Sequence, residues 1–426
     1  MTTEKFRLAL LFKPSYIVPR LRSIRSPREA ARRAADLARY LALGAGNCLY
    51  AARGAFMRAW PGAAEDVRWA WRAGRSAALA PVRLAAGLRR ELRLYRAVAG
   101  YKATKGRERV PNPPPPSAGK PPPAVHLSWN IHVACNYDCP YCWFHGRWGE
   151  FAGGSVSLSP AEWARHWDRF NDRHGAAEIH IAGGEPFIYP GFAEIAAGLS
   201  RRNVLYVITN LSWEPGDIIG KLDPARVGFS ASYHAAAAGP ADAFAEKVLR
   251  LRRAGFHATA SIVAYPPYLE GLPAAADAFL SRGIYAVVQP FRGEWRGGAY
   301  PGAYTRAERA LVGWLARGGH LAAYGAAAAP AAGMRGETED FGREYMLAPR
   351  RTRGLACDAG RAYGRLQFNG DMIRCSQGGY VGNFLKEDFS MAASAAPCPF
   401  RRCECVNEVV YVEGGPYGPA VSGPRP

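Results

Sequence analysis

The sequence predicts an α/β fold built on a parallel sheet, with a helical region before the sheet and a cysteine-rich region after it. Between residues 124 and 304, six short apolar runs alternate with helical segments. Residues 27–100 are dominated by Ala, Leu and Arg, and a run of Gly, Cys and short strand-like pieces follows Gly354. Strands that alternate with helices indicate parallel pairing through right-handed crossovers.

The N-terminal region, residues 1–109, is predicted to be a basic helical extension. Residues 1–110 hold 24 Lys and Arg against seven Asp and Glu, so most of the net charge of +20 lies there. Pro61 and Pro81 divide the region into helices. The many Ala, Gly and Arg residues fit a GC-rich genome, so basic composition alone is weak support for nucleic-acid binding and we consider that partner unlikely.

Four uses of this extension remain open: packing on its own sheet domain, docking an acidic electron donor, lying on an anionic membrane surface, or holding an acidic substrate. Basic helices with interfacial aromatic residues suit a membrane surface. The chain shows no secretory signal pattern and no apolar stretch of about 18 residues. We therefore expect a cytoplasmic protein, with peripheral membrane contact as one of the four uses.

Residues 110–123 are rich in proline and cannot form a regular hydrogen-bond ladder. They are predicted to be an extended linker that marks a domain boundary. The sheet domain should follow at residues 124–304, then a connecting helical segment at 305–353 and a small domain at 354–426. Strands are expected at 126–133, 178–181, 204–208, 226–232, 258–264 and 284–289, and helices at 160–173, 192–200, 241–254 and 273–282.

Eight of the nine cysteines fall in two groups whose spacing suits metal or cluster ligation. Such thiols must stay reduced, which indicates a reducing compartment. The first group, Cys135, Cys139 and Cys142, directly follows the first strand. Three thiolates can bind three irons of a cubane cluster and leave the fourth iron open to another ligand. Part of a zinc site is the alternative, although structural zinc takes four ligands. Cys48 stands alone and is expected to be a core thiol.

The CxxxCxΦC spacing, with Tyr141 at the aromatic position, resembles the signature of the radical SAM superfamily. Residues Gly183, Gly184, Glu185 and Pro186 follow the second strand and resemble the family's GGEP motif. The resemblance implies a partial (β/α)6 TIM-like barrel, a 4Fe-4S cluster on the three cysteines, and S-adenosylmethionine on the open iron. It implies that Glu185 receives the cofactor's ammonium group.

Two further strand ends resemble the same family and would contact the same cofactor. Residues 204–210, which end in Asn210, are similar to its third strand, and residues 228–234 to its fourth, where a polar side chain meets the ribose. We choose Ser232 over Ser230 for that contact on the alternation of strand side chains.

The second cysteine group consists of Cys357, Cys375, Cys398, Cys403 and Cys405. Cys357 and Cys375, with Gly370 five residues before the latter, resemble the opening of the twitch and SPASM extensions. The resemblance implies one auxiliary 4Fe-4S cluster. The five cysteines are the candidates for its four ligand positions. A zinc-stabilised hairpin is the alternative.

These patterns predict a radical SAM enzyme, an oxidoreductase or modifying enzyme, that cleaves S-adenosylmethionine to a 5′-deoxyadenosyl radical. The radical would take a hydrogen atom from a polar substrate such as a peptide, a sugar or another metabolite. The auxiliary cluster would assist oxidation or substrate binding, and flavodoxin or ferredoxin would supply the electron. The loop at 291–301 mixes Arg, Glu and aromatic residues and is expected at the barrel mouth. The alternative function is a basic zinc-binding nucleic-acid module without catalysis.

Overall fold

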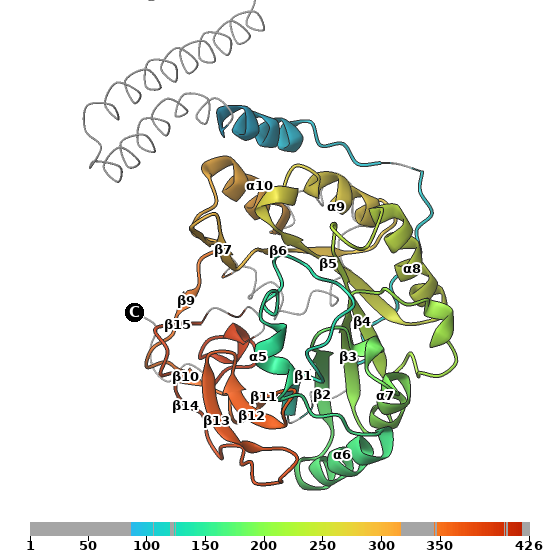
Figure 1. Cartoon of the computed structure of the whole chain (residues 1–426), viewed down its shortest axis with the longest axis vertical. Coiled ribbons are helices and arrows are strands. Elements are labelled where there is room, and N and C mark those ends of the chain that lie inside the picture. The colour runs from blue at the N-terminus through green and yellow to red at the C-terminus, as the bar shows by residue number, and fades with distance from the viewer. Residues whose placement is uncertain are drawn as a thin grey trace, which may run out of the picture. The chain divides into compact units, whose positions relative to one another are not determined.

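The computed structural model of the chain describes residues 87–104, 106–119, 123, 125–316, 345, 347–403, 405 and 408–419. The predicted N-terminal extension up to residue 86, Cys48 and most of the predicted 305–353 segment lie outside these residues. The chain divides into two compact units, Met1–Arg93 and Leu94–Pro426. The barrel and both cysteine groups belong to the second unit (Figure 1).

A nine-stranded sheet organises this unit, in the order β13-β12-β11-β1-β2-β3-β4-β5-β6. Strands β1 to β6 pair in parallel, and β11 pairs in parallel with the other side of β1. The confirmed barrel strands are β1 (Val125–Asn130), β2 (Ala177–Ala182), β3 (Val204–Thr209), β4 (Val227–Tyr233), β5 (His257–Ala264) and β6 (Ala286–Pro290). The partial α/β barrel predicted from the sequence is therefore present.

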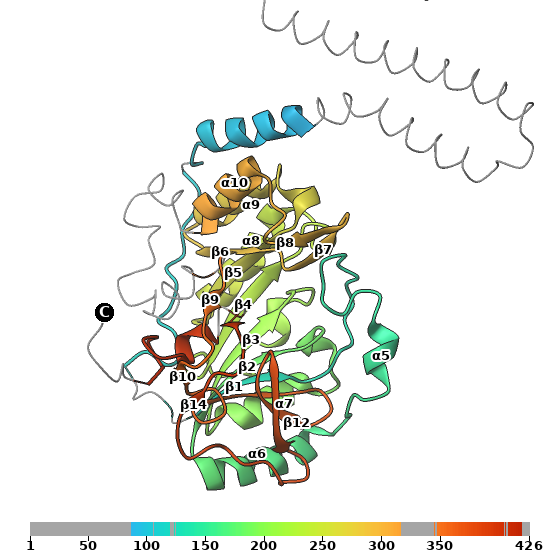
Figure 2. The same cartoon turned by 90° about the vertical axis from the view of Figure 1, so that its left-hand side faces the viewer.

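Helices cover the outer face of the curved sheet, as the two views show (Figures 1 and 2). They are α6 (Pro160–His174), α7 (Phe192–Ser200), α8 (Ala241–Arg253), α9 (Leu272–Leu280) and α10 (Arg306–Ala316). Helix α6 starts at a capping box in which Ser159 and Glu162 satisfy each other's backbone donors. Helices α7, α8, α9 and α10 each follow a strand, and the crossovers return the chain to the same edge, so strands β1 to β6 all run one way.

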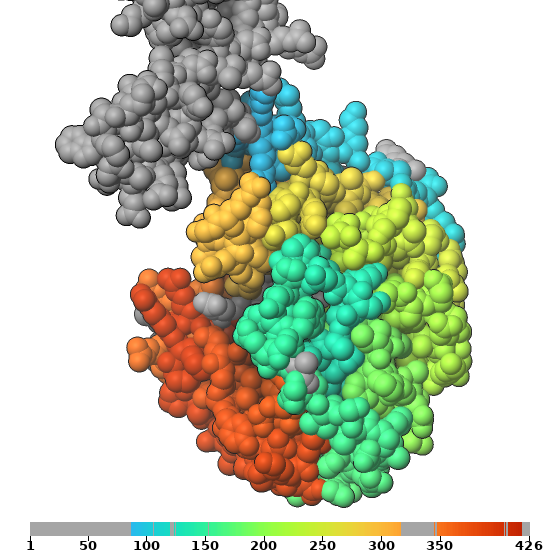
Figure 3. Space-filling view, in the orientation of Figure 1, coloured from blue at the N-terminus to red at the C-terminus, as the bar shows by residue number. Residues whose placement is uncertain are grey.

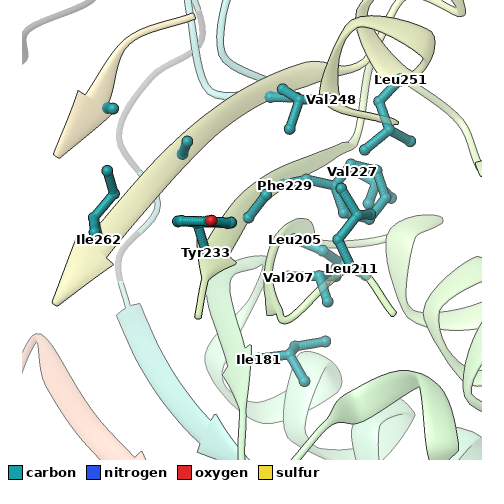
Figure 4. Close-up of a cluster of buried hydrophobic side chains, with 14 of the residues drawn as sticks. Ile181, Leu205, Val207, Leu211, Val227, Phe229, Tyr233, Val248, Leu251 and Ile262 are labelled. Atoms are coloured by element: carbon teal, nitrogen blue, oxygen red, sulfur yellow. The ribbon is translucent and has the colours of Figure 1, made fainter. Parts of the chain in front are cut away.

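The two faces of the sheet differ in chemistry. Side chains at one parity along the strands, among them Ile181, Val207 and Phe229, are buried in the core against the helices (Figure 4). Side chains of the other parity on β2, β4 and β5 include Ser230, Ser232 and several more that are only partly buried. Side chains alternate between the two faces along a strand. The apolar set packs against the helices and so fixes the register, and the polar set therefore points to the inside of the barrel.

The proline-rich segment at 110–123 is not a free linker. Asn112 accepts a hydrogen bond through Oδ1 from the Ala258 backbone N–H at 2.9 Å, and the Pro113 carbonyl is 2.8 Å from His257 Nδ1. Buried Arg252 donates to the Val110 carbonyl at 3.1 Å. The segment is therefore a strap across the starts of β4 and β5. Proline favours an extended chain but does not prevent its carbonyls from accepting hydrogen bonds.

The C-terminal part joins the barrel instead of standing apart from it. Strands β11 (Tyr363–Leu366), β12 (Asp371–Cys375) and β13 (Gly378–Asn383) extend the central sheet. A second, smaller core gathers four cysteines with the turn η5 (Val409–Tyr411). The remaining short elements are α5 (Trp148–Ala152), η1 (Pro186–Ile188), η2 (Pro215–Asp217), η3 (Pro266–Tyr268), β7 (Gly293–Trp295), β8 (Gly298–Tyr300), β9 (Arg350–Arg351), β10 (Ala356–Cys357), β14 (Ala396–Pro397) and β15 (Arg402–Cys403).

Within the described ranges, no helix is long and apolar enough to cross a membrane.

Candidate metal centre

The first cysteine group lies in the loop between β1 and α5. Cys139 is buried, and Cys135 and Cys142 are half-buried free thiols. Burial raises the pKa of all three thiols. Together with the nearby Cys142 and Cys135, burial raises the pKa of Cys139 to about 11. In Figure 3 the segment around α5 lies near the centre of the face in view, beside the C-terminal strands. The loop therefore brings three desolvated thiols together near the surface.

These thiols fit a cubane cluster. Three desolvated thiolates need a cationic partner, which iron supplies. The part of the chain that the structure describes holds no group of three or more His, Cys, Asp or Glu arranged around one metal ion. In a cubane each cysteine binds a different iron, so convergence on a single point is not required.

The glycines of the GGEP segment hold this loop by direct backbone contact. The Gly184 N–H donates to the His132 carbonyl, and the Glu185 N–H to the Ala134 carbonyl, each at 2.9 Å. A Cβ on Gly184 would lie 1.7 Å from the Ala134 oxygen, and one on Gly183 would lie 2.3 Å from the His132 oxygen. Only glycine permits this approach, so the motif is built against the chain that leads into Cys135.

The Glu185 side chain is fully buried and already has protein partners. Its carboxylate accepts from the Thr209 hydroxyl at 2.7 Å, the Asn210 N–H at 2.6 Å and the Phe187 N–H at 3.1 Å. Burial raises its pKa, and these three donors act in the opposite direction. The structure thus engages both carboxylate oxygens with protein groups, whereas the sequence assigned Glu185 to the ammonium group of the cofactor. Pro186, also buried, begins η1 directly after it.

Asn210 connects the end of β3 to the cysteine loop. Its side-chain amide donates to Asn136 Oδ1 at 2.8 Å and contacts the Cys135 sulfur at 3.8 Å. Its backbone N–H is the donor to Glu185 described above. Asn210 therefore lies beside the first cysteine of the group. The sequence predicted that Asn210 contacts the cofactor.

Tyr141 lies in an aromatic group at the C-terminal ends of β4 and β5. Its hydroxyl is 2.9 Å from His234 Nδ1, and its ring centroid is 5.2 Å from that of Tyr265. Burial lowers the pKa of His234 to about 4, so this imidazole is neutral near pH 7. Tyr265 contacts Phe291 at 5.0 Å and Trp295 at 6.2 Å between centroids. The aromatic group thus runs from the cysteine loop to the β7–β8 hairpin of the predicted mouth loop.

Ser232 lies on the inner face of the barrel, with its Oγ 3.3 Å from that of Ser261. Ser230 is two residues away and therefore lies on the same face, so alternation does not separate the two serines. Ser232 differs in being nearer to the C-terminal end of β4, where a barrel site is built.

Sequence reasoning missed Thr209, Asn136 and His132. His132 is buried, and its Nε2 is 2.8 Å from the Glu185 carbonyl. Thr209 and Asn136 each stand next to a residue that was chosen, Asn210 and Cys135. Their position next to chosen residues was the signal that could have found them. Their partners on other parts of the chain could be identified only from the three-dimensional structure.

The second cysteine group lies in the small C-terminal core. Cys357, Cys375, Cys398 and Cys403 are buried in it, whereas Cys405 is half-buried. Burial raises the pKa of Cys375 to about 11 and that of Cys357 as well, and Cys398 adds to the effect on Cys357. The structure therefore places the five candidates in one region.

Residues 129–270 match the family model described as the radical SAM superfamily. The barrel and the three-cysteine loop fit the same class, so this part of the chain is a radical SAM domain and the protein is an enzyme. A domain of this family implies a 4Fe-4S cluster and S-adenosylmethionine. No curated protein matches the chain significantly.

Three solved structures are distantly similar to this chain. Native anSMEcpe with bound AdoMet and Kp18Cys peptide is 13% identical, with a TM-score of 0.44, and 63% of this chain covers 79% of that one. SuiB from Streptococcus suis is 11% identical, with a TM-score of 0.40 and coverage of 78% and 77%. BtrN in complex with AdoMet and 2-DOIA is 13% identical, with a TM-score of 0.31 and coverage of 62% and 79%. Likenesses this distant say nothing further about the activity.

Proposed function

We propose that this enzyme carries a primary cluster on Cys135, Cys139 and Cys142 and an auxiliary 4Fe-4S cluster in the C-terminal core, and that it oxidises or modifies a polar substrate. The observation that carries the proposal is the presence of two separate sets of desolvated cysteines in one compact unit, one in the loop after β1 and one in the C-terminal core. When bound, the primary cluster and S-adenosylmethionine supply a 5′-deoxyadenosyl radical that takes a hydrogen atom from an unactivated carbon.

For the auxiliary site we propose the ligands Cys357, Cys375, Cys398 and Cys403. These four are the buried members of the group, and one 4Fe-4S cluster takes four thiolates. Cys405 is half-buried and outside the shared core, which makes it the spare thiol. The zinc alternative for this region predicts about four irons and one zinc per chain, and the iron–sulfur proposal predicts about eight irons and no zinc.

The chain's own residues would orient the primary site in two ways. Gly183 and Gly184 hold the cysteine loop by backbone contact, and Asn210 fixes the Cys135 side of it. Tyr141, Tyr265 and the β7–β8 hairpin would exclude water from the aromatic side. Radical chemistry avoids side reactions when the reacting groups are held in fixed positions and water is excluded from the site.

The proposed substrate is polar and binds against the inner face of the barrel. Ser230, Ser232, Thr259 and Ser261 on that face are only partly buried and offer neutral hydrogen-bonding groups. Peptides and sugars both present many such groups. A flavodoxin or ferredoxin would approach near Trp143, which follows Cys142 directly and is 62% exposed.

Iron analysis after anaerobic reconstitution tests the two-cluster proposal. The chain should hold about eight irons, because each 4Fe-4S cluster contributes four. Replacing Cys135, Cys139 and Cys142 together with Ala should remove about half, and replacing Cys357, Cys375, Cys398 and Cys403 should remove the other half. A Cys405→Ala variant is the matched control and should keep all eight.

Two results would contradict this account. Full iron retention in the first triple variant would mean that the primary site is wrong. A chain that never exceeds four irons would refute the auxiliary cluster.

A further inference from the structure

Glu408 is a buried carboxylate at the centre of the C-terminal core. It is 2% exposed and accepts hydrogen bonds from four donors. The Ser376 N–H and hydroxyl are 2.8 and 2.5 Å away, the Tyr363 hydroxyl is 3.2 Å away, and Arg365 Nη1 is 3.1 Å away. Removing a carboxylate from water is costly, so a site that keeps one must supply such donors.

The donors connect Glu408 to both halves of the second cysteine group. Ser376 directly follows Cys375 at the end of β12, and the Glu408 N–H donates to the Cys405 carbonyl at 3.2 Å. Glu408 is also near enough to the Cys375 and Cys403 thiols to act on both electrostatically. One side chain therefore joins the β12 cysteine to the segment that holds Cys403 and Cys405.

Arg365 anchors this arrangement on the central sheet. It lies on β11, in register with Ser128 of β1, and its side chain forms the ion pair with Glu408. Strand β1 leads into the loop of the primary cysteines. The Arg365–Glu408 ion pair thus links the barrel sheet directly to the second cysteine group.

We propose that Glu408 is a positioning residue for the auxiliary cluster, holding Cys375 and Cys403 at ligating separation through Ser376 and fixing them to the barrel through Arg365. This inference rests on the auxiliary cluster proposed above. It goes further in assigning to a residue outside the cysteine pattern the role of setting the geometry and charge of that site. A negative group beside a cluster opposes its reduction, so Glu408 should also lower the cluster's reduction potential.

The test uses the full chain with Cys135, Cys139 and Cys142 replaced by Ala, so that any bound iron belongs to the second site. In this background we compare Glu408→Gln, Ser376→Ala and Asp358→Asn. Asp358 is the matched control, because it is a buried carboxylate beside Cys357 whose side chain pairs, among the described residues, with Arg361, three residues along. Bound iron, the rate of iron release to a chelator, and the reduction potential by EPR titration are measured.

The unsubstituted background should hold about four irons, and Glu408→Gln should hold half or less, release iron about tenfold faster and show a more positive potential. Ser376→Ala removes a single hydroxyl, so it should fold even if Glu408→Gln does not, and it should still release iron several-fold faster. Asp358→Asn should match the background in iron content and in the rate of iron release. Iron content, release rate and potential that match the background in both test variants would overturn the inference. A background that binds no iron would refute the auxiliary cluster itself.

Discussion

At the scale of single residues, the Glu185 carboxylate illustrates how the site is held. Three donors from β3 and η1 converge on it, and its own backbone N–H binds the chain that leads into Cys135. A fully buried carboxylate with these partners is a structural link between the β2 end, the β3 end and the cysteine loop. Its loss should therefore disturb the cluster loop as well as any contact with the cofactor.

We predict that Glu185→Ala destabilises the domain by at least about 3 kcal/mol. The change leaves the Thr209 hydroxyl and the Asn210 and Phe187 N–H groups without an acceptor, and each unsatisfied buried donor costs about 1–3 kcal/mol. Denaturant unfolding measures the loss, and iron analysis should show reduced binding at the primary site. Glu185→Gln keeps one carbonyl acceptor, so its free energy of unfolding should lie between those of the parent protein and the alanine variant. An alanine variant with unchanged stability and iron but weaker S-adenosylmethionine binding would instead support a direct contact with the ammonium group.

Residues whose role is set by local spacing were predictable from the sequence. The three cysteines and the two glycines of the GGEP segment are recognised because the chemistry requires them at fixed intervals. Thr209, Asn136 and Glu408 were not predicted, because their partners come from other strands and depend on the register of the sheet. The role of Glu185 was assigned from the motif, and its burial among three donors emerges only in the fold.

At the scale of elements, the proline-rich strap closes the N-terminal side of the sheet. Its carbonyls and the Asn112 amide satisfy groups on β5 and α8, and Pro116 packs where a side chain on Gly228 would otherwise stand. The sequence predicted an extended segment, and the structure has no regular secondary structure at 110–115 and a turn at 116–119. The sequence could not show that the segment is docked, because an extended proline chain has the same pattern in a linker and on a surface.

We predict that Asn112→Ala lowers the free energy of unfolding of the barrel by about 1–3 kcal/mol. The variant leaves the Ala258 N–H without its acceptor at the start of a buried strand. Glu108→Gln is the control, since Glu108 forms an exposed ion pair with Arg253 and such pairs contribute about 0–1 kcal/mol. Denaturant unfolding of both variants makes the comparison. Equal stability of Asn112→Ala and the parent protein would mean that the segment behaves as a linker.

At the scale of the whole second unit, the central sheet connects the regions of the two cysteine groups, because β1 leads into the first group and β12 ends at Cys375 of the second. Strand β11 pairs with β1, so the C-terminal strands continue the barrel wall on the side opposite β2. The alternation of strands and helices predicted the six barrel strands closely, because each has a strongly apolar parity. The junction of β11 with β1 was not predicted, since it pairs residues more than 230 positions apart in the chain. The N-terminal basic extension remains a sequence prediction.

The central claim is that the loop of Cys135, Cys139 and Cys142 makes this chain a radical SAM enzyme. Release of 5′-deoxyadenosine from S-adenosylmethionine, measured by chromatography after anaerobic reconstitution and reduction with dithionite, tests it most directly. The parent chain should form 5′-deoxyadenosine slowly even without substrate, and the variant with all three cysteines replaced by Ala should form none above the protein-free control. Equal formation by the parent and the triple variant, or none by a reconstituted parent that holds its full iron, would contradict the account.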